Sequence, residues 1–152
     1  MQIETAHLLV RDFRETDVRD LHAILGDPAV MQFIEPPFSM RLTKSFISAV
    51  GPCRPPRIYA VIWKQSGELI GRLIWRPWDE SSMELGWILR QDYWGRGLAK
   101  ELTATMLPLT EKDIVIECSA KQAVTRHIVE SFGFALSNET SDLTIYRFRK
   151  TL

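Results

Sequence analysis

The apolar residues of the first fifty positions recur mostly at helical spacing. Residues 7–14 are typical of a first strand, after which Thr16 can cap a helix. A short helical turn through residues 30–31 precedes the Glu35-Pro36-Pro37 segment, where successive prolines exclude helix, and Ser39 can cap the next helix. The residues expected to face inward are Val18, Leu21 and Leu25 in the first helix, and Leu42, Phe46, Ile47 and Val50 in the second.

The period then changes to two. Residues 57–64 and 68–76 are typical of strands, and the Gln65-Ser66-Gly67 turn between them predicts a hairpin. A second turn at residues 77–81 leads into a third strand at 82–90. The middle of the chain is therefore predicted to form an antiparallel meander.

The last third alternates between helix and strand. A helix begins near Leu98, with Leu102 and Met106 on the same face, and ends near Pro108. Residues 113–118 form a short apolar run typical of a buried parallel strand. The last helix has apolar residues at four-residue steps, ends at a glycine and precedes two strands; its landmarks are Val124, Ile128, Phe132, Gly133 and residues 134–137 and 143–149. The order predicts an α/β (α+β) fold with a mixed sheet of six to seven strands and about four helices.

Composition adds exclusions to this picture. The 152 residues suit one domain, residues 1–152, and 45% hydrophobic with 25% charged residues is ordinary for a globular protein. Lys plus Arg equals Asp plus Glu at 19 each, which disfavours nucleic acid as a partner. No apolar run is long enough to span a membrane. Cys53 and Cys118 give no metal spacing and are predicted to be free thiols, so we expect a cytoplasmic protein without a metal.

The chemistry is concentrated in residues 85–102, which predict a strand, a glycine-bearing turn and a helix in succession. Gly95 and Gly97 can adopt backbone angles closed to other residues, and the helix from Leu98 directs unpaired N–H groups at the same place. A helix N-terminus favours a phosphate or pyrophosphate. The segment has no Gly-Lys-Ser/Thr ending, and Lys100 occupies the place of the third glycine of Gly-x-Gly-x-x-Gly, so both common phosphate loops are excluded.

What remains is Gly-x-Gly-x-Ala after the aromatic pair Tyr93-Trp94. This loop resembles the acetyl-CoA pyrophosphate loop of the GNAT-type N-acetyltransferases. The longer string from Glu84 to Glu101 is similar to the branch that modifies the N-termini of ribosomal proteins. The resemblance implies a GNAT-like fold in which strands 83–90 and 113–118 splay apart and hold the pantetheine arm between them. Acetyl-CoA would be the cosubstrate.

The same resemblance assigns residues to the cofactor. The main chain of Ile88, Leu89 and Arg90 would bond the pantetheine amides, and the pyrophosphate would be surrounded by Gly95, Arg96, Gly97, Leu98 and Ala99. Arg96 would add a charge-assisted contact or remain a solvated loop cation. Trp94 is expected to pack under the loop rather than touch substrate.

A second match is Gln122-Ala123-Val124-Thr125 before the Gly133-Phe134 pair, which is similar to the family's Asn-x-x-Ser. Gln122 keeps an amide on a longer arm and is assigned to the cofactor. Thr125 keeps the hydroxyl that would donate to the departing CoA thiolate, because the later position that holds a tyrosine in many relatives is Val129. A helix-surface threonine without a role is the alternative.

The acceptor amine must be neutral to attack, and a general base helps. Glu84 is our candidate base, because it lies on the opposite strand face from Met83 and Leu85 and is expected to project into the substrate cleft. Glu35 is a weaker candidate at the border of the acceptor pocket. Trp75, Trp78 and Trp87 flank the predicted cleft and would line this pocket, with a place in the core as the alternative for each. The acceptor would be a protein N-terminus or a small amine, and the protein a monomer or homodimer.

Two other readings compete with an active enzyme. One is a catalytically inactive module that holds acyl-CoA as a regulator or partner, which the replacements Gln122, Thr125 and Val129 keep open. The other is an ATP-binding protein that uses the same loop, although no acidic magnesium site accompanies the glycines. Binding of acetyl-CoA in preference to ATP, and loss of turnover in a Thr125 variant, distinguish these readings.

Overall fold

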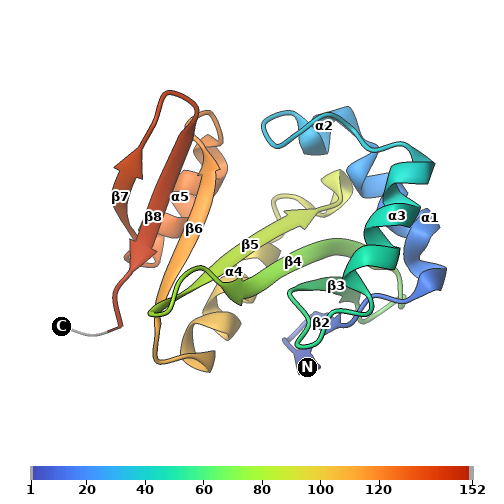
Figure 1. Cartoon of the computed structure of the whole chain (residues 1–152), viewed down its shortest axis with the longest axis horizontal. Helices are drawn as coiled ribbons and strands as arrows, with labels where there is room; N and C mark the ends of the chain where they lie inside the picture. Colours follow the sequence, from blue (N-terminus) through green and yellow to red (C-terminus); the bar gives the residue numbers. More distant parts are fainter. Residues whose placement is uncertain (1, 151–152) are drawn as a thin grey trace.

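A computed structural model of the chain describes residues 2–150, so the ends of the predicted domain range 1–152 lie outside it. Eight strands form one open sheet (Figure 1). The strands are β1 (Ile3–Glu4), β2 (Leu8–Arg11), β3 (Ile58–Trp63), β4 (Leu69–Pro77), β5 (Ser82–Leu89), β6 (Asp113–Ser119), β7 (Ala135–Glu139) and β8 (Leu143–Phe148). The helices are α1 (Val18–Leu25), α2 (Pro28–Met31), α3 (Met40–Val50), α4 (Leu98–Met106) and α5 (Ala123–Ser131), with 3-10 turns at Glu15–Asp17, Gln91–Tyr93 and Leu107–Leu109.

The sheet has the order β1-β2-β3-β4-β5-β6-β8-β7. All neighbouring strands are antiparallel except β5 and β6, which are parallel because α4 crosses between them. These two strands pair over only three residues of each, Ser82 to Glu84 with Asp113 to Val115. Beyond this point they diverge, and Figure 1 shows the widening gap below α2. The predicted mixed sheet with splayed central strands is confirmed.

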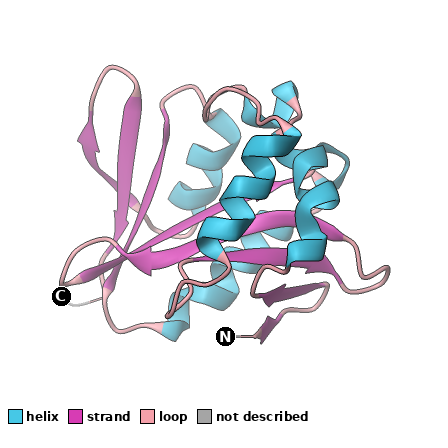
Figure 2. Ribbon diagram, turned by 45° about the vertical axis from the view of Figure 1, so that its right-hand side comes forward, coloured by secondary structure: helices cyan, strands magenta, loops and turns pink. Residues whose placement is uncertain are grey.

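Helices cover both faces of the sheet (Figure 2). On one face, α4 and α5 contribute Leu98, Leu102, Met106 and Val129 to the larger apolar core. On the other, α1, α2 and α3 pack over the smaller core, which includes Ile88 of β5. None of the helices described between residues 2 and 150 is long and apolar enough to cross a lipid bilayer.

The sequence pattern located the elements well and some of their details less well. Ser39 caps α3 as predicted, since its hydroxyl accepts from the Leu42 amide at 3.1 Å, and both cysteines are free. The cap predicted at Thr16 is wrong: Thr16 lies inside a 3-10 turn, and Asp17 directs its carboxylate back to the Arg14 amide at 2.7 Å. Leu42, predicted to face inward, is exposed. The additional strand, β1, has two residues and is too short to produce a pattern.

The N-terminal hairpin is fastened to α4 by Glu101. Its carboxylate accepts hydrogen bonds from Thr5, from the His7 amide at 3.0 Å and from the His7 ring at 2.7 Å. Burial opposes ionisation of Glu101, but these hydrogen bonds outweigh it, so the pKa of Glu101 lies below its usual value. The bonds connect the start of the chain to the helix whose N-terminus faces the glycine loop.

We expect Glu101→Gln to lower the free energy of unfolding at pH 7 by about 1–2 kcal/mol, because a charged acceptor of several hydrogen bonds is lost. Since the folded-state pKa is lowered, the stabilisation is fully present above the ordinary carboxyl pKa and is lost as the pH falls through the folded value. The free energies of unfolding of the wild type and the variant should therefore converge as the pH falls, which urea titrations at a series of pH values would measure. Glu111→Gln, at an exposed position, is the matched control, and an equal loss in both variants would contradict the assignment.

Candidate active site

The glycine loop opens directly into α4. Gly95 and Gly97 have φ of 75° and 77°, the left-handed region that other residues rarely adopt. Gly97 occupies the N-cap position and no side chain caps the helix. The first intrahelical bond runs from the Glu101 amide to the Gly97 carbonyl at 3.0 Å, so the amides of Leu98, Ala99 and Lys100 have no partner within the helix. These groups form a ready site for an anion.

The open edge of β5 offers a second set of main-chain groups. Successive residues of an antiparallel strand point their N–H and C=O groups to opposite edges. The Arg90 amide donates to Ile70 of β4 at 2.7 Å, so alternation turns the groups of Ile88 to β4 as well and those of Trp87 and Leu89 to the gap. The expected use of the Ile88 and Arg90 amides is therefore wrong, because both are used within the sheet, whereas the groups of Leu89 remain on the open edge.

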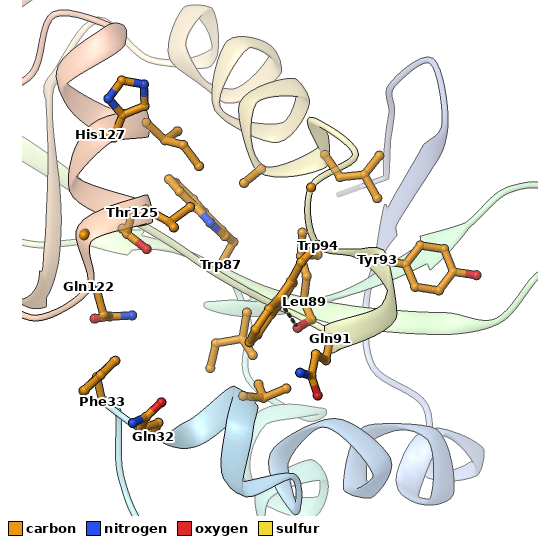
Figure 3. Close-up of a pocket in the computed structure, with 18 of the residues that line it drawn as sticks. Gln32, Phe33, Trp87, Leu89, Gln91, Tyr93, Trp94, Gln122, Thr125 and His127 are labelled. Atoms are coloured by element: carbon orange, nitrogen blue, oxygen red, sulfur yellow. Dashed lines mark hydrogen bonds between the residues drawn. The ribbon is translucent and has the colours of Figure 1, made fainter.

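A cavity of about 860 Å³ lies between the end of β5 and the start of α5. Its walls come from α2 and the segment after it, the end of β5, the glycine loop with the start of α4, and the start of α5. Figure 3 shows Trp87 extending from β5 toward Thr125, while Phe33 approaches Gln122 from the other side. The size lies within the usual range for cavities that bind small molecules and cofactors.

Trp94 stands in this cavity rather than beneath the loop. Its side chain is 47% exposed, and its indole N–H donates to the Leu89 carbonyl at 2.9 Å (Figure 3). The expectation that Trp94 packs under the loop is therefore wrong. The bond fixes the ring beside the main chain of β5, where it offers an apolar face to a bound molecule.

The cations of the cavity differ from those expected. Lys100 and Lys121 line it from opposite walls. Arg96, in contrast, places its guanidinium over the Tyr93 ring at 4.5 Å and does not line the cavity. Arg90 binds Asp92 at 2.7 Å, and this hydrogen bond is the main reason that the pKa of Asp92 lies below its usual value. Both arginines thus brace the loop from outside.

A smaller cavity of about 100 Å³ adjoins the first on the α1 to α3 side of the sheet. Arg72 and Ile74 of β4, Gly86 of β5 and Glu117 of β6 are among the residues that line it. The cross-strand register pairs Arg72 with Ile88 and Ile74 with Gly86, so these positions share one face of the sheet. The residues that line both cavities are Ile34, Trp87, Ile88, Gln122 and Thr125.

The start of α5 is held firmly at this junction. Gln122 accepts from the Ser119 amide at 2.8 Å, which leaves its side-chain N–H₂ to face the cavities. Further along, Arg126 donates to the Tyr146 hydroxyl at 2.9 Å, and this hydroxyl donates to Glu130 at 2.9 Å. Thr125 is half-buried and lines both cavities, whereas Val129 is fully buried in the core.

The apolar stripe of the last helix is divided between the cavity and the core, where Phe132 packs. Val124 is 75% exposed and lines the large cavity together with Ile128. A helix that borders a binding cavity shows the same periodicity as one that packs on a core, which is why the sequence pattern could not separate them.

Three predicted acceptor-side residues lie elsewhere. Trp75 is buried in the larger core, on the opposite face of the sheet from Arg72, so its predicted place in the acceptor pocket is wrong. Glu84 accepts a hydrogen bond from Arg76 at 2.7 Å across the β4–β5 pair and lines neither cavity. Glu35 is exposed and lines neither cavity, but it follows Ile34, which lines both.

Sequence reasoning also missed residues that the structure brings into the site. Glu117 lies inside a run whose pattern is typical of a fully buried strand, although it is the one charged residue of positions 114–118. Lys100 and Lys121 directly follow or precede the recognised motifs. Gln32 carried no signal beyond its nearness to the segment 33–36, which was expected to border the acceptor pocket. Within residues 2–150, no three His, Cys, Asp or Glu side chains are grouped so that they could hold a metal ion.

Three features define the class of protein: two parallel strands that diverge, an uncapped helix N-terminus and a cavity beside both. They suit a protein that binds an extended, phosphate-bearing molecule along β5. The comparisons agree with this class. The Acetyltransferase (GNAT) domain family matches residues 7–135. The chain therefore belongs to the GNAT family of acetyltransferases, whose acyl donor in general is acetyl-CoA.

Individual relatives are distant but span the whole fold. An uncharacterized N-acetyltransferase of Bacillus subtilis, YnaD, is 24% identical over 140 residues, 88% of this chain and 82% of the relative. The structure of a GNAT-family acetyltransferase from Bacillus anthracis superposes with a TM-score of 0.87 at 20% identity, with 99% of both chains covered. RimL, a ribosomal L7/L12 α-N-protein acetyltransferase in complex with CoA, gives 0.82 at 16% identity over 98% of both chains.

Proposed function

We propose that the protein transfers the acetyl group of acetyl-CoA to a primary amine by direct attack within a ternary complex. The observation that carries the proposal is the meeting of the two cavities at Trp87, Gln122 and Thr125. A donor in the large cavity and an acceptor in the small one would be in contact there and nowhere else. The geometry of the large cavity fits the donor: the α4 N-terminus suits a pyrophosphate, and the β5 edge suits an amide-containing arm.

Thr125 is proposed to stabilise the departing thiolate with a hydrogen bond from its hydroxyl. In the reaction the amine nitrogen forms a bond to the thioester carbonyl carbon, and the carbon–sulfur bond breaks. The Thr125 hydroxyl donates to the sulfur, and an N–H group on the open edge of β5, of Trp87 or Leu89, supports the charge on the carbonyl oxygen. Thr125 is the hydroxyl of α5 that lines both cavities.

Two carboxylates are candidates for the base that takes the proton of the amine. Glu117 lines the acceptor cavity, on the same strand face as Gly86. Glu84 lies at the end of the segment of β5 that pairs with β6, and its carboxylate is bound to Arg76. We assign the base to Glu117 and keep Glu84 as the alternative, because a base must reach the amine directly or through one water.

The acceptor is proposed to be a protein N-terminus or a small primary amine. The structural likeness to RimL, which is described as an α-N-protein acetyltransferase, favours the first. An α-amine also ionises near pH 8, so it loses its proton far more readily than a lysine side chain. A catalytically inactive acyl-CoA-binding module would share the large cavity but would not need a second cavity opening onto Thr125.

We expect Thr125→Ala to lower kcat by about 10-fold, because a hydrogen bond to the departing thiolate stabilises the transition state and contributes little to ground-state binding. Thr125→Ser should restore most of the rate, since it keeps the hydroxyl. Release of CoA, followed with a thiol reagent, measures the rate, and calorimetry measures the Kd for CoA. An unchanged kcat in Thr125→Ala would remove this residue from the mechanism.

The proposed function itself is tested by calorimetric titration with acetyl-CoA, CoA and ATP, followed by a screen of amines for CoA release. Micromolar binding of both CoA species without a response to ATP supports the donor site. CoA release that depends on an added amine supports the enzyme, whereas tight CoA binding with no turnover across peptides and small amines would favour the inactive module.

A further inference from the structure

Arg72 is the unusual residue of the acceptor cavity. It lies in the middle of β4, opposite Ile88 of β5, and its side chain projects onto the cavity side of the sheet. Only 8% of the residue is exposed, and its Nε is buried without a hydrogen-bond partner. The contact that its guanidinium does make is with the ring of Phe46, 5.7 Å from its centroid.

Such an arrangement costs stability unless something compensates it. A buried guanidinium has five N–H donors, and each one left unpaired loses the hydrogen bonds it made to water. Burial lowers the pKa of Arg72 from its usual value, while the charges of Glu35 and Glu84 act in the opposite direction. The neighbouring Arg76 forms a salt bridge with Glu84. Among the described residues, Arg72 forms none.

The rest of the cavity has the opposite charge on its far wall. Glu117 stands on β6 and Arg72 on β4, with β5 between them, so their main chains are at least two strand spacings apart, roughly 10 Å. Ile74 and Ile34 supply the apolar surface around them. The cavity therefore presents a cation and a carboxylate on opposite sides of a space of about 100 Å³, a volume comparable to one residue.

We propose that Arg72 binds a carboxylate of the acceptor, so that the enzyme prefers primary amines whose own carboxylate lies within one residue of the reacting nitrogen. The inference rests on the proposed function and defines its substrate class. A carboxylate can accept two parallel bonds from a guanidinium, one of them from the Nε that is buried without a partner. The amine would then lie toward Glu117 and the junction at Thr125.

The carboxylate has two sources, an amino acid's own α-carboxylate or an acidic side chain at the start of a peptide. The probes are therefore a panel of amino acids with their carboxamides, and peptide amides that begin with Asp or Glu with their Asn and Gln counterparts. Binding of the N-acetylated form of each probe to the CoA-bound protein is measured by calorimetry, which needs no turnover. Rates with the free amines are measured in parallel.

We expect the acidic member of at least one pair to bind about 30- to 100-fold more tightly than its neutral counterpart, a preference lost in Arg72→Gln. In Arg72→Gln the KM for the acidic amine should rise by a similar factor, while the KM for acetyl-CoA stays unchanged. The pairs that show the preference identify the source of the carboxylate. Carboxylate-dependent binding without turnover would support the assignment of Arg72 while overturning the proposed enzyme.

Folding is controlled with two further variants. Arg72→Met replaces the buried cation by an apolar side chain of similar length, and its Tm should be unchanged or raised by about 2–4 °C if Arg72 serves a ligand rather than the fold. Arg149→Gln removes the same charge from an exposed site outside both cavities and should leave the preference intact. Equal binding of acidic and neutral probes by the wild type, or a preference that survives in both Arg72 variants, would overturn the proposal.

Discussion

Gly97→Ala is expected to raise the Kd for CoA about 10-fold. The left-handed conformation at φ 77° costs a residue with a Cβ roughly 1–2 kcal/mol, and a displaced loop would no longer aim the first amides of α4 at the pyrophosphate. The cost is conformational rather than steric, because a Cβ at this position would meet no atom within 4 Å. The double variant with Gly95→Ala should reach about 100-fold.

Gly67 provides a matched control for this effect. It has φ of 76° and equally open surroundings, but it lies in the hairpin turn between β3 and β4 and lines neither cavity. Gly67→Ala should therefore lower Tm about as much as Gly97→Ala does, because the conformational cost is the same, and should leave the Kd for CoA unchanged. If the two substitutions weakened CoA binding equally, the loop would have no specific part in the donor site.

The second large effect concerns the base. Glu117→Gln should lower kcat/KM by about 100-fold near pH 7, because the amide keeps the shape of the side chain but cannot accept the proton. Glu84→Gln should change kcat/KM by less than about 3-fold, since its carboxylate is occupied by Arg76. Both are measured as the rate of CoA release over a range of amine concentrations at saturating acetyl-CoA.

The comparison of the two glutamates is decisive in either direction. A large loss in Glu84→Gln with little change in Glu117→Gln would return the role of base to Glu84. Thermal unfolding of each variant separates a chemical effect from a structural one, because loss of the Arg76 partner in Glu84→Gln would by itself lower Tm.

The order of elements and the family were accessible from the sequence because their signals are local. A strand, two glycines and a helix start lie within eighteen residues, and the amphipathic helices reveal themselves by period. The pairing of Glu84 with Arg76 was not accessible, because it depends on the register that the turn after β4 imposes. The place of Trp75 in the core follows from the same register.

Residues at the splayed strands were the hardest to assign. Glu117 sits in a run of apolar residues whose pattern predicts burial on both faces, and only the divergence of β6 from β5 gives its carboxylate an open space. The place of Val124 at the cavity could not be predicted for a related reason: a helix beside a cavity and a helix on a core share one periodicity. Tertiary geometry, which no local pattern encodes, decided both cases.

The short pairing of β5 with β6 has a consequence for the order of events. Five strands lie on one side of this seam and three on the other, and three residue pairs join them. A molecule that contacts both β5 and α5 would therefore hold the two sub-sheets at one angle to each other. Since the second cavity is bounded by these same two parts, we expect the donor to bind first and the acceptor to find its site only then, giving compulsory-order kinetics.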